Sequence, residues 1–112
     1  MNFANIPTVP AGDVPADAVL LDVREPDEWA AGRAEGALHV PIREVVDRLP
    51  EITERAGDGP LYVLCRVGGR SAQVTGFLVQ QGIDATNVAG GLQAWHEAGK
   101  PLVSDAGEPF VL

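Results

Sequence analysis

The residues with the clearest capacity for chemistry are consecutive in the sequence: Cys65-Arg66-Val67-Gly68-Gly69-Arg70-Ser71. Cys65 is the only cysteine in 112 residues, which excludes an internal disulfide and a zinc site built from several thiolates. A lone cysteine is most often a small buried apolar residue. The neighbours of Cys65 favour a different interpretation, because cations and a following helix N-terminus stabilise the thiolate, which is the nucleophilic form of cysteine.

The rest of this segment has the composition of an anion-binding loop. Glycine adopts positive φ angles without steric cost, so Gly68 and Gly69 allow the chain to curl and to point successive N–H groups inward. Arg66 and Arg70 flank the curl and carry planar donor groups that suit an anion. Neither nucleotide-phosphate pattern, G-x-G-x-x-G or G-x-x-x-x-G-K-[ST], is present. We therefore predict a nucleophilic Cys65 beside a small bound anion.

Five segments have the composition of strands: 6–9, 19–23, 37–40, 61–65 and 85–88. The runs 19–23 and 61–65 are continuously apolar, which is typical of strands covered on both faces. The segment 6–9 is expected at an edge of the sheet, because prolines limit its pairing. Cys65 would then end a buried strand, where ligands bind in open parallel sheets.

Four segments between the strands have helical signals: 26–31, 42–49, 71–81 and 92–98. In the second, Ile42, Val45, Val46 and Leu49 have the spacing of one helical face, and Pro50 is expected to end or kink the helix. The alternation of strands and helices predicts a three-layer α/β/α domain around a central, mainly parallel sheet of about five strands.

Aromatic and acidic residues on these helices have simple structural interpretations. Trp29 and Trp95 are predicted to pack in the core. The acidic residues are interpreted as solvated helix faces. They are Glu25, Asp27, Glu28, Glu44, Asp47, Glu51 and Glu54.

Composition narrows the range of partners and locations. With 8 basic and 16 acidic residues the chain has a net charge of -8, which argues against nucleic acid or an anionic membrane as the main partner. The longest apolar runs are far shorter than the ~20 residues of a membrane span. The first residues lack the pattern of a secretory signal, so a cytoplasmic location is expected. The high content of Ala, Gly, Val and Arg suggests a GC-rich bacterial genome.

The cysteine loop and three further segments, in this order along the chain, resemble the rhodanese-like domains, specifically the single-domain sulfurtransferases. The further segments are Leu21-Asp22-Val23-Arg24-Glu25 with Glu28-Trp29, Gly36-Ala37-Leu38-His39-Val40-Pro41, and Gly90-Gly91-Leu92-Gln93-Ala94-Trp95 through Ala98-Gly99-Lys100-Pro101-Leu102. The resemblance spans about residues 6–103. We therefore expect one rhodanese-like domain over 1–112, with an irregular tail at 104–112.

The resemblance implies a sulfurtransferase. Cys65 would take sulfane sulfur from a small anionic donor such as thiosulfate, carry it as a persulfide, and pass it to cyanide or a thiol, including a thiol on another protein. The substrate-binding residues would be Arg66, Val67, Gly68, Gly69 and Arg70. Supporting roles are assigned to Asp22, Arg24 and Ser71. The resemblance implies no cofactor and no metal.

One residue departs from the family pattern. Arg33 stands in the segment Gly32-Arg33-Ala34-Glu35-Gly36-Ala37, where the family often has histidine. We expect Arg33 to be solvated rather than to lie near the rim of the site. A role that the family assigns to this histidine therefore does not carry over to this chain.

Other functions are less well supported by the sequence. Phosphatases of similar fold use Cys-x5-Arg, and Cys65 to Arg70 is Cys-x4-Arg, one residue too short; arsenate reduction also favours the longer loop. A Cys–His nucleophile would need His39 or His96, and nothing in the sequence places either beside Cys65. A sulfur carrier without turnover, or a persulfide-sensing interaction module, stays open as an alternative.

Overall fold

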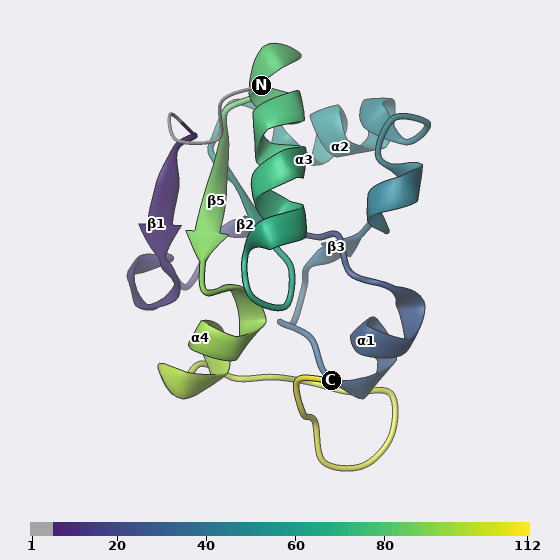
Figure 1. Ribbon diagram of the computed structural model, residues 1–112, viewed down its shortest axis with the longest axis vertical. Coiled ribbons are helices and arrows are strands. Elements are labelled where there is room, and N and C mark those ends of the chain that lie inside the picture. The colour runs from purple at the N-terminus through teal and green to yellow at the C-terminus, as the bar shows by residue number, and fades with distance from the viewer. Residues whose placement is uncertain (1–5) are drawn as a thin grey trace.

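The apolar runs form a single sheet, and the computed structural model describes residues 6–112 of the chain. The strands are β1 Thr8–Pro10, β2 Val19–Asp22, β3 Leu38–His39, β4 Leu61–Leu64 and β5 Ala85–Ala89. All pairs are parallel, in the order β1-β5-β4-β2-β3 (Figure 1). The predicted five-strand parallel sheet is confirmed, and β1 occupies an edge.

Helices cover both faces of this sheet. They are α1 Pro26–Ala31, α2 Leu49–Ala56, α3 Gly69–Gln80 and α4 Gly91–Glu97, with short 3-10 turns η2 Ala11–Asp13 and η3 Ile42–Glu44. Leu21 and Val63 pack toward α2 and α3, whereas Leu20 and Leu64 pack toward η2 and α4. Adjacent residues of one strand therefore enter opposite core layers, which explains why the central strands are apolar without alternation.

The predicted helix over 42–49 is wrong. Only Ile42–Glu44 forms a 3-10 turn, and α2 begins at Leu49 with Pro50 in its first turn. Proline is tolerated there because its missing N–H would have no partner inside the helix. Val46, which the helical spacing placed on a buried face, is 69% exposed, and Ile52 in α2 is buried instead.

The two tryptophans behave differently. Trp95 is buried in the core layer beneath α4, as predicted. Trp29 is only half-buried, and no residue of its helix α1 is buried, so the core position predicted for it is wrong. Its ring stacks on His39 with centroids 4.5 Å apart, and the Arg33 guanidinium lies 4.8 Å from the ring centroid.

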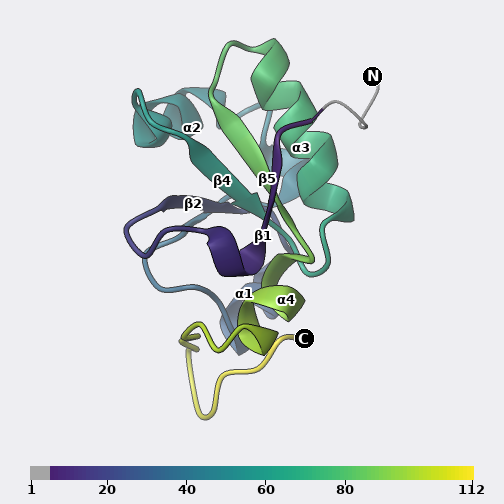
Figure 2. The same ribbon diagram turned by 90° about the vertical axis from the view of Figure 1, so that its left-hand side faces the viewer.

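The C-terminal segment holds α1 in place from outside. It loops past α4 and α1 (Figure 1 and Figure 2). Arg33 and Val103 exchange two backbone hydrogen bonds, and Arg33 Nη1 also donates to Asp105 Oδ1 at 2.7 Å. The expectation that Arg33 is solvated is therefore wrong, because it joins α1 to a segment 70 residues later. Phe110 packs its backbone so closely on Gly32 that a Cβ there would lie 2.9 Å from the Phe110 carbonyl carbon.

Between residues 6 and 112, no helix is long and apolar enough to cross a membrane.

Candidate active site

Cys65 lies directly after β4, at the carboxyl edge of the sheet. Its strand is flanked by β2 on one side and β5 on the other. The side chain is only 1% exposed and packs in the core layer beneath α3. The carboxyl ends of the three parallel strands β2, β4 and β5 thus meet near Cys65. Helix α3 begins four residues after Cys65.

The Cys65 sulfur receives hydrogen-bond partners from its own loop. The Gly68 N–H donates to Sγ at 3.0 Å. Ser71 Oγ lies 3.3 Å from Sγ and donates to Asn87 Oδ1 at 2.6 Å. A hydroxyl has one proton, so Ser71 can accept from a Cys65 thiol while bonded to Asn87, or turn its proton to a Cys65 thiolate. The sulfur therefore has a neutral amide donor and an adjustable hydroxyl beside it.

The loop geometry depends on glycine at one of its two glycine positions. Gly68 has φ +113°, a region that residues with a side chain rarely adopt, and it turns the chain into α3 while its own N–H points at the sulfur. Gly69 has no positive φ, because it is already the first residue of α3. The curl predicted from both glycines is thus made by Gly68 alone.

The start of α4 fixes the backbone of the loop from the other side. The N–H groups of Leu92 and Gln93 donate to the carbonyls of Cys65 and Arg66 at 2.9 and 3.0 Å. Gly91 approaches these carbonyls so closely that an added Cβ would lie 2.6 Å from the Arg66 oxygen. The Gly90-Gly91 pair, which the sequence marked only as part of a resemblance, therefore locks the segment that carries the cysteine.

Arg70 is held by Glu28 of α1 rather than left open. Its Nη1 and Nη2 donate to Oε1 and Oε2 of Glu28 at 2.7 and 2.9 Å. This hydrogen bonding lowers the pKa of Glu28 and raises the pKa of Arg70, so both partners are charged near neutral pH. Smaller electrostatic contributions from Cys65 and Asp22 act on the pKa of Arg70 in the same direction.

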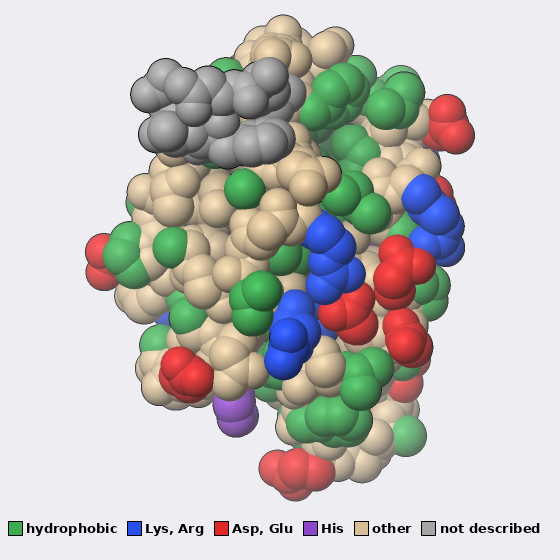
Figure 3. Space-filling model, in the orientation of Figure 1, with side chains coloured by type: hydrophobic (Ala, Val, Ile, Leu, Met, Phe, Trp, Pro, Cys, Tyr) green, Lys and Arg blue, Asp and Glu red, His purple; other side chains and the backbone are tan. Residues whose placement is uncertain are grey.

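Glu28 was expected on a solvated helix face, and that expectation is wrong. Its side chain is 13% exposed, against 33% for Arg70. Besides binding Arg70, its Oε1 accepts from the Glu25 N–H at the start of α1. The sequence offered one clue, since Glu28 is the third residue of a helix and can complete such a capping pair. In Figure 3, acidic side chains lie directly against basic ones on this face, below α3.

Asp22 and Arg24 form a second pair, and this one is completely buried. Arg24 Nη2 donates to Asp22 Oδ2 at 2.8 Å and to the Gly32 carbonyl at 2.7 Å, and Nη1 donates to the Glu28 carbonyl at 3.3 Å. The pair therefore ties the end of β2 to the middle of α1 and to Gly32, the residue that caps its carboxyl end. Within residues 6–112, its hydrogen bonds go to α1 and not to the Cys65 sulfur.

The remaining predicted residues lie apart from the sulfur. Arg66 and Val67 are exposed on the outer side of the loop, and no ion pair involves Arg66 in the described part of the chain. His39 Nε2 bonds to the Arg24 carbonyl at 2.8 Å, and His96 is exposed on α4. Neither histidine is bonded to Cys65 among the residues described, so the structure does not support a Cys–His nucleophile.

Asn87 is a polar residue that the sequence analysis missed. It lies in β5 opposite Val63 of β4, is almost fully buried, and binds Ser71. The signal was available, because a buried asparagine inside an apolar strand needs a hydrogen-bond partner.

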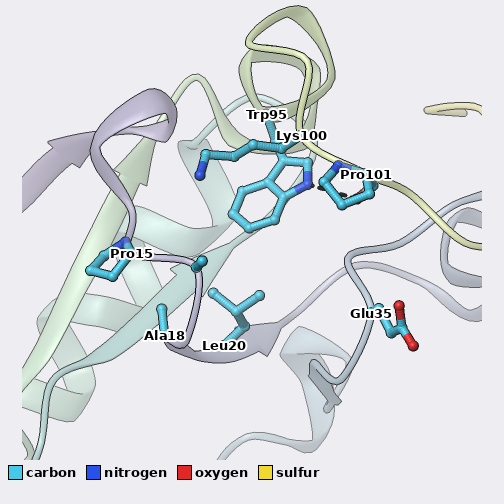
Figure 4. A pocket seen from close by; sticks show the side chains of 8 residues that line it. Pro15, Ala18, Leu20, Glu35, Trp95, Lys100 and Pro101 are labelled. Carbon is cyan, nitrogen blue, oxygen red and sulfur yellow. Dashed lines mark hydrogen bonds between the residues drawn. The ribbon is translucent and has the colours of Figure 1, made fainter.

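A well-formed cavity lies elsewhere. It has a volume of about 310 Å³ and is lined by residues that include Leu20, Trp95, Lys100 and Pro101 (Figure 4). These residues belong to the start of β2 and to α4 with the segment after it. No loop residue from 65 to 71 lines this cavity, so it is separate from the cysteine.

Comparison with known protein families identifies the family to which this chain belongs. The rhodanese-like domain family matches residues 11–98. The chain is a rhodanese-like domain. A sulfurtransferase of Allochromatium vinosum is 37% identical over 92 residues, covering 81% of this chain and 83% of the relative. A thiosulfate sulfurtransferase of Actinobacillus succinogenes is 34% identical over 87 residues, covering 77% of this chain and 76% of the relative.

Solved structures support the same fold. A rhodanese-related protein of Thermoplasma volcanium superimposes with a TM-score of 0.78 at 36% identity, covering 87% of this chain and 97% of that one. The family and the three-layer α/β fold predicted from the sequence are thus confirmed. Relatives named sulfurtransferase support a sulfurtransferase-type enzyme.

Proposed function

We propose that this rhodanese-like domain transfers sulfane sulfur from a donor such as thiosulfate to a thiol or cyanide through a persulfide on Cys65. The observation that carries the proposal is the Gly68 N–H at 3.0 Å from a cysteine sulfur at the carboxyl edge of the sheet. Preorganised N–H donors stabilise charge that develops on a reacting atom.

The donor step conserves atoms and charge. The Cys65 thiolate attacks the terminal sulfur of thiosulfate, the S–S bond of the donor breaks, and its electron pair leaves on sulfite. Cys65 then carries a persulfide. In the second step cyanide or a thiol attacks the outer sulfur, and the bond electrons return to Cys65 as thiolate, with thiocyanate or a new persulfide released.

Each loop residue has a role in this proposal. The backbone amides of residues 66–70 cradle the outer sulfur or the donor anion, Arg66 supplies positive charge, and Arg70 contributes only to the extent that its pairing with Glu28 allows. Ser71 accepts a hydrogen bond from a Cys65 thiol and donates one to a Cys65 thiolate, because its single hydroxyl proton can turn toward either Asn87 or the sulfur. Asp22 and Arg24 position the surrounding helix. No general base is required, because the nucleophile enters as a thiolate.

Burial supports a small reacting group. With Cys65 only 1% exposed, the reacting end of a donor must reach a narrow space beside the Gly68 amide. A single terminal sulfur atom fits that requirement better than a phosphate with three oxygens. The Cys-x4-Arg spacing supports the same choice against a phosphatase.

Intact-mass spectrometry after incubation with thiosulfate tests the proposal. We expect wild type to gain one sulfur atom and Cys65→Ala to gain none. Addition of cyanide should remove the extra mass and release thiocyanate. If no sulfane donor adds mass to the wild-type protein, the proposed function is wrong.

The same samples separate an enzyme from a sulfur carrier. An enzyme releases many thiocyanate molecules per protein molecule, whereas a carrier or sensor stops after one transfer. Counting thiocyanate against protein over time therefore distinguishes the two roles.

A further inference from the structure

The charges around Cys65 nearly cancel. Asp22 balances Arg24, and Glu28 balances Arg70. Arg66 is thus the only loop arginine without an ion pair in residues 6–112. A donor that approaches the sulfur therefore meets about one uncompensated positive charge, although the loop and its surroundings contain three arginines.

Several contacts hold Glu28 and Arg70 together as an ion pair. Both guanidinium nitrogens that face Glu28 are in use, and the pKa shifts of the two partners keep both charged. Glu28 is also fixed by the Glu25 N–H, and its helix is anchored by Arg24. Moving Arg70 onto a bound anion would break both of its hydrogen bonds to Glu28 and leave that carboxylate, which is 13% exposed, without its arginine.

Sulfane donors differ in the charge they bring to such a site. Thiosulfate carries two negative charges and meets a thiolate, so three negative charges gather during attack. A persulfide brings fewer charges to the reacting end: none as R–S–SH and one as R–S–S⁻. With R–S–SH, the Cys65 thiolate attacks the terminal sulfur, the S–S bond breaks, R–S⁻ leaves with the electron pair, and the proton stays on the sulfur that becomes Cys65–S–SH.

We propose that Glu28 is a specificity-determining residue, which neutralises Arg70 and thereby directs the site toward sulfane donors with one negative charge or none, such as low-molecular-weight persulfides, and away from dianions. This inference rests on the proposed sulfur transfer and names the donor class for it. It also assigns a role to a carboxylate that would otherwise be only an ion-pair partner.

Two donors of nearly equal shape test the charge directly. Methanethiosulfonate replaces one oxygen of thiosulfate with a methyl group and so carries one negative charge in place of two. Wild type should use methanethiosulfonate with the higher kcat/KM. Glu28→Gln keeps an oxygen for the Glu25 N–H but frees Arg70, and should raise kcat/KM for thiosulfate about tenfold, or about 1.4 kcal/mol. The value for methanethiosulfonate should change by less than about threefold.

Glu51→Gln is the matched control. Glu51 pairs with Arg48 on α2, so this variant removes the same formal charge from the chain but not from the site. The ratio between the two donors should stay at the wild-type value. An unchanged ratio in Glu28→Gln, or an equal change in Glu51→Gln, would overturn the proposal.

A second measurement requires no sulfur transfer. An anion bound beside Cys65 slows the alkylation of its sulfur. Iodoacetamide is neutral, so it does not compete for the anion site by charge, and the slowing of its reaction measures how well each anion binds. In wild type, sulfate should protect at no lower concentration than methanesulfonate. In Glu28→Gln, sulfate should protect at about a tenfold lower concentration. Strong preference for sulfate in wild type would refute the role of Glu28, even if Cys65 never formed a persulfide.

Discussion

Two arginine–carboxylate pairs flank the strand end that carries Cys65, and they differ in their access to water. Asp22–Arg24 is fully buried, and its spare donors go to backbone carbonyls of α1. Glu28–Arg70 lies at the rim with both side chains partly exposed. The same chemical pair is thus expected to serve two purposes. Burial makes the first pair part of the scaffold, whereas we propose that the second, partly exposed pair faces the incoming donor.

The largest expected effect comes from breaking the buried pair. Arg24→Met leaves the Asp22 carboxylate without a partner in the interior, and should lower the free energy of unfolding by about 3–5 kcal/mol. Urea denaturation measures this loss. The double variant Asp22→Asn, Arg24→Met removes the stranded charge and should recover part of it. A loss below about 1 kcal/mol in the single variant would show that the buried pair is not structural.

Breaking the Glu28–Arg70 pair at the rim should have the opposite result, with a large effect on activity and a small effect on stability. Arg70→Ala removes a cation and leaves Glu28 facing the donor, so kcat/KM for thiosulfate should fall at least about tenfold. Stability should change by only about 0–1 kcal/mol, as for other partly exposed pairs. Thiocyanate production and urea denaturation of one preparation measure both quantities.

Arg48→Ala provides the control for this variant, because Arg48 is exposed to a similar degree and pairs with Glu51 away from the site. It should match the small stability change and leave activity intact. Parallel losses of activity and stability in Arg70→Ala would contradict the division between the two pairs.

The smallest effect is a pH dependence of the rim pair. The pKa of Glu28 in the folded chain is lowered below its ordinary 4.5, mainly by the hydrogen bond from Arg70. A lowered folded pKa means that the stabilisation is present above about pH 4.5 and is lost as pH falls through the folded value. The gap in unfolding free energy between wild type and Glu28→Gln, up to about 1 kcal/mol, should close below that pH. Urea curves from pH 7 downward measure it, and a gap that widens in acid would contradict the assigned cause.

The parts predictable from the sequence are those set by local pattern. The continuous apolar runs identified β2 and β4, and the Gly-rich segment placed Cys65 between a strand and a helix. These features depend on residues close in the chain. Pro50 shows the limit of such reasoning, since a proline can end one helix or begin the next, and only the packing of Ile52 decided between them.

The missed features depend on distant partners. Glu28 and Arg70 are separated by 42 positions, and Arg33 and Asp105 by 72. A charged residue on a short helix gives no local sign of whether water or another side chain will surround it. The sequence could name the arginines of the loop, but only the fold shows that one of them already has a partner.

The C-terminal segment has a consequence for which distant residues can disturb the rim of the site. Helix α1 buries none of its own residues and is held in part by backbone bonds from Asp105 and Phe110 to Ala30 and Ala31. Glu28 belongs to this helix, so a segment that follows every strand of the sheet helps to seat the carboxylate that binds Arg70. Displacement of residues 103–110 would therefore loosen α1 and shift Glu28 relative to Arg70, although none of the displaced residues is hydrogen-bonded to the side chains of that pair.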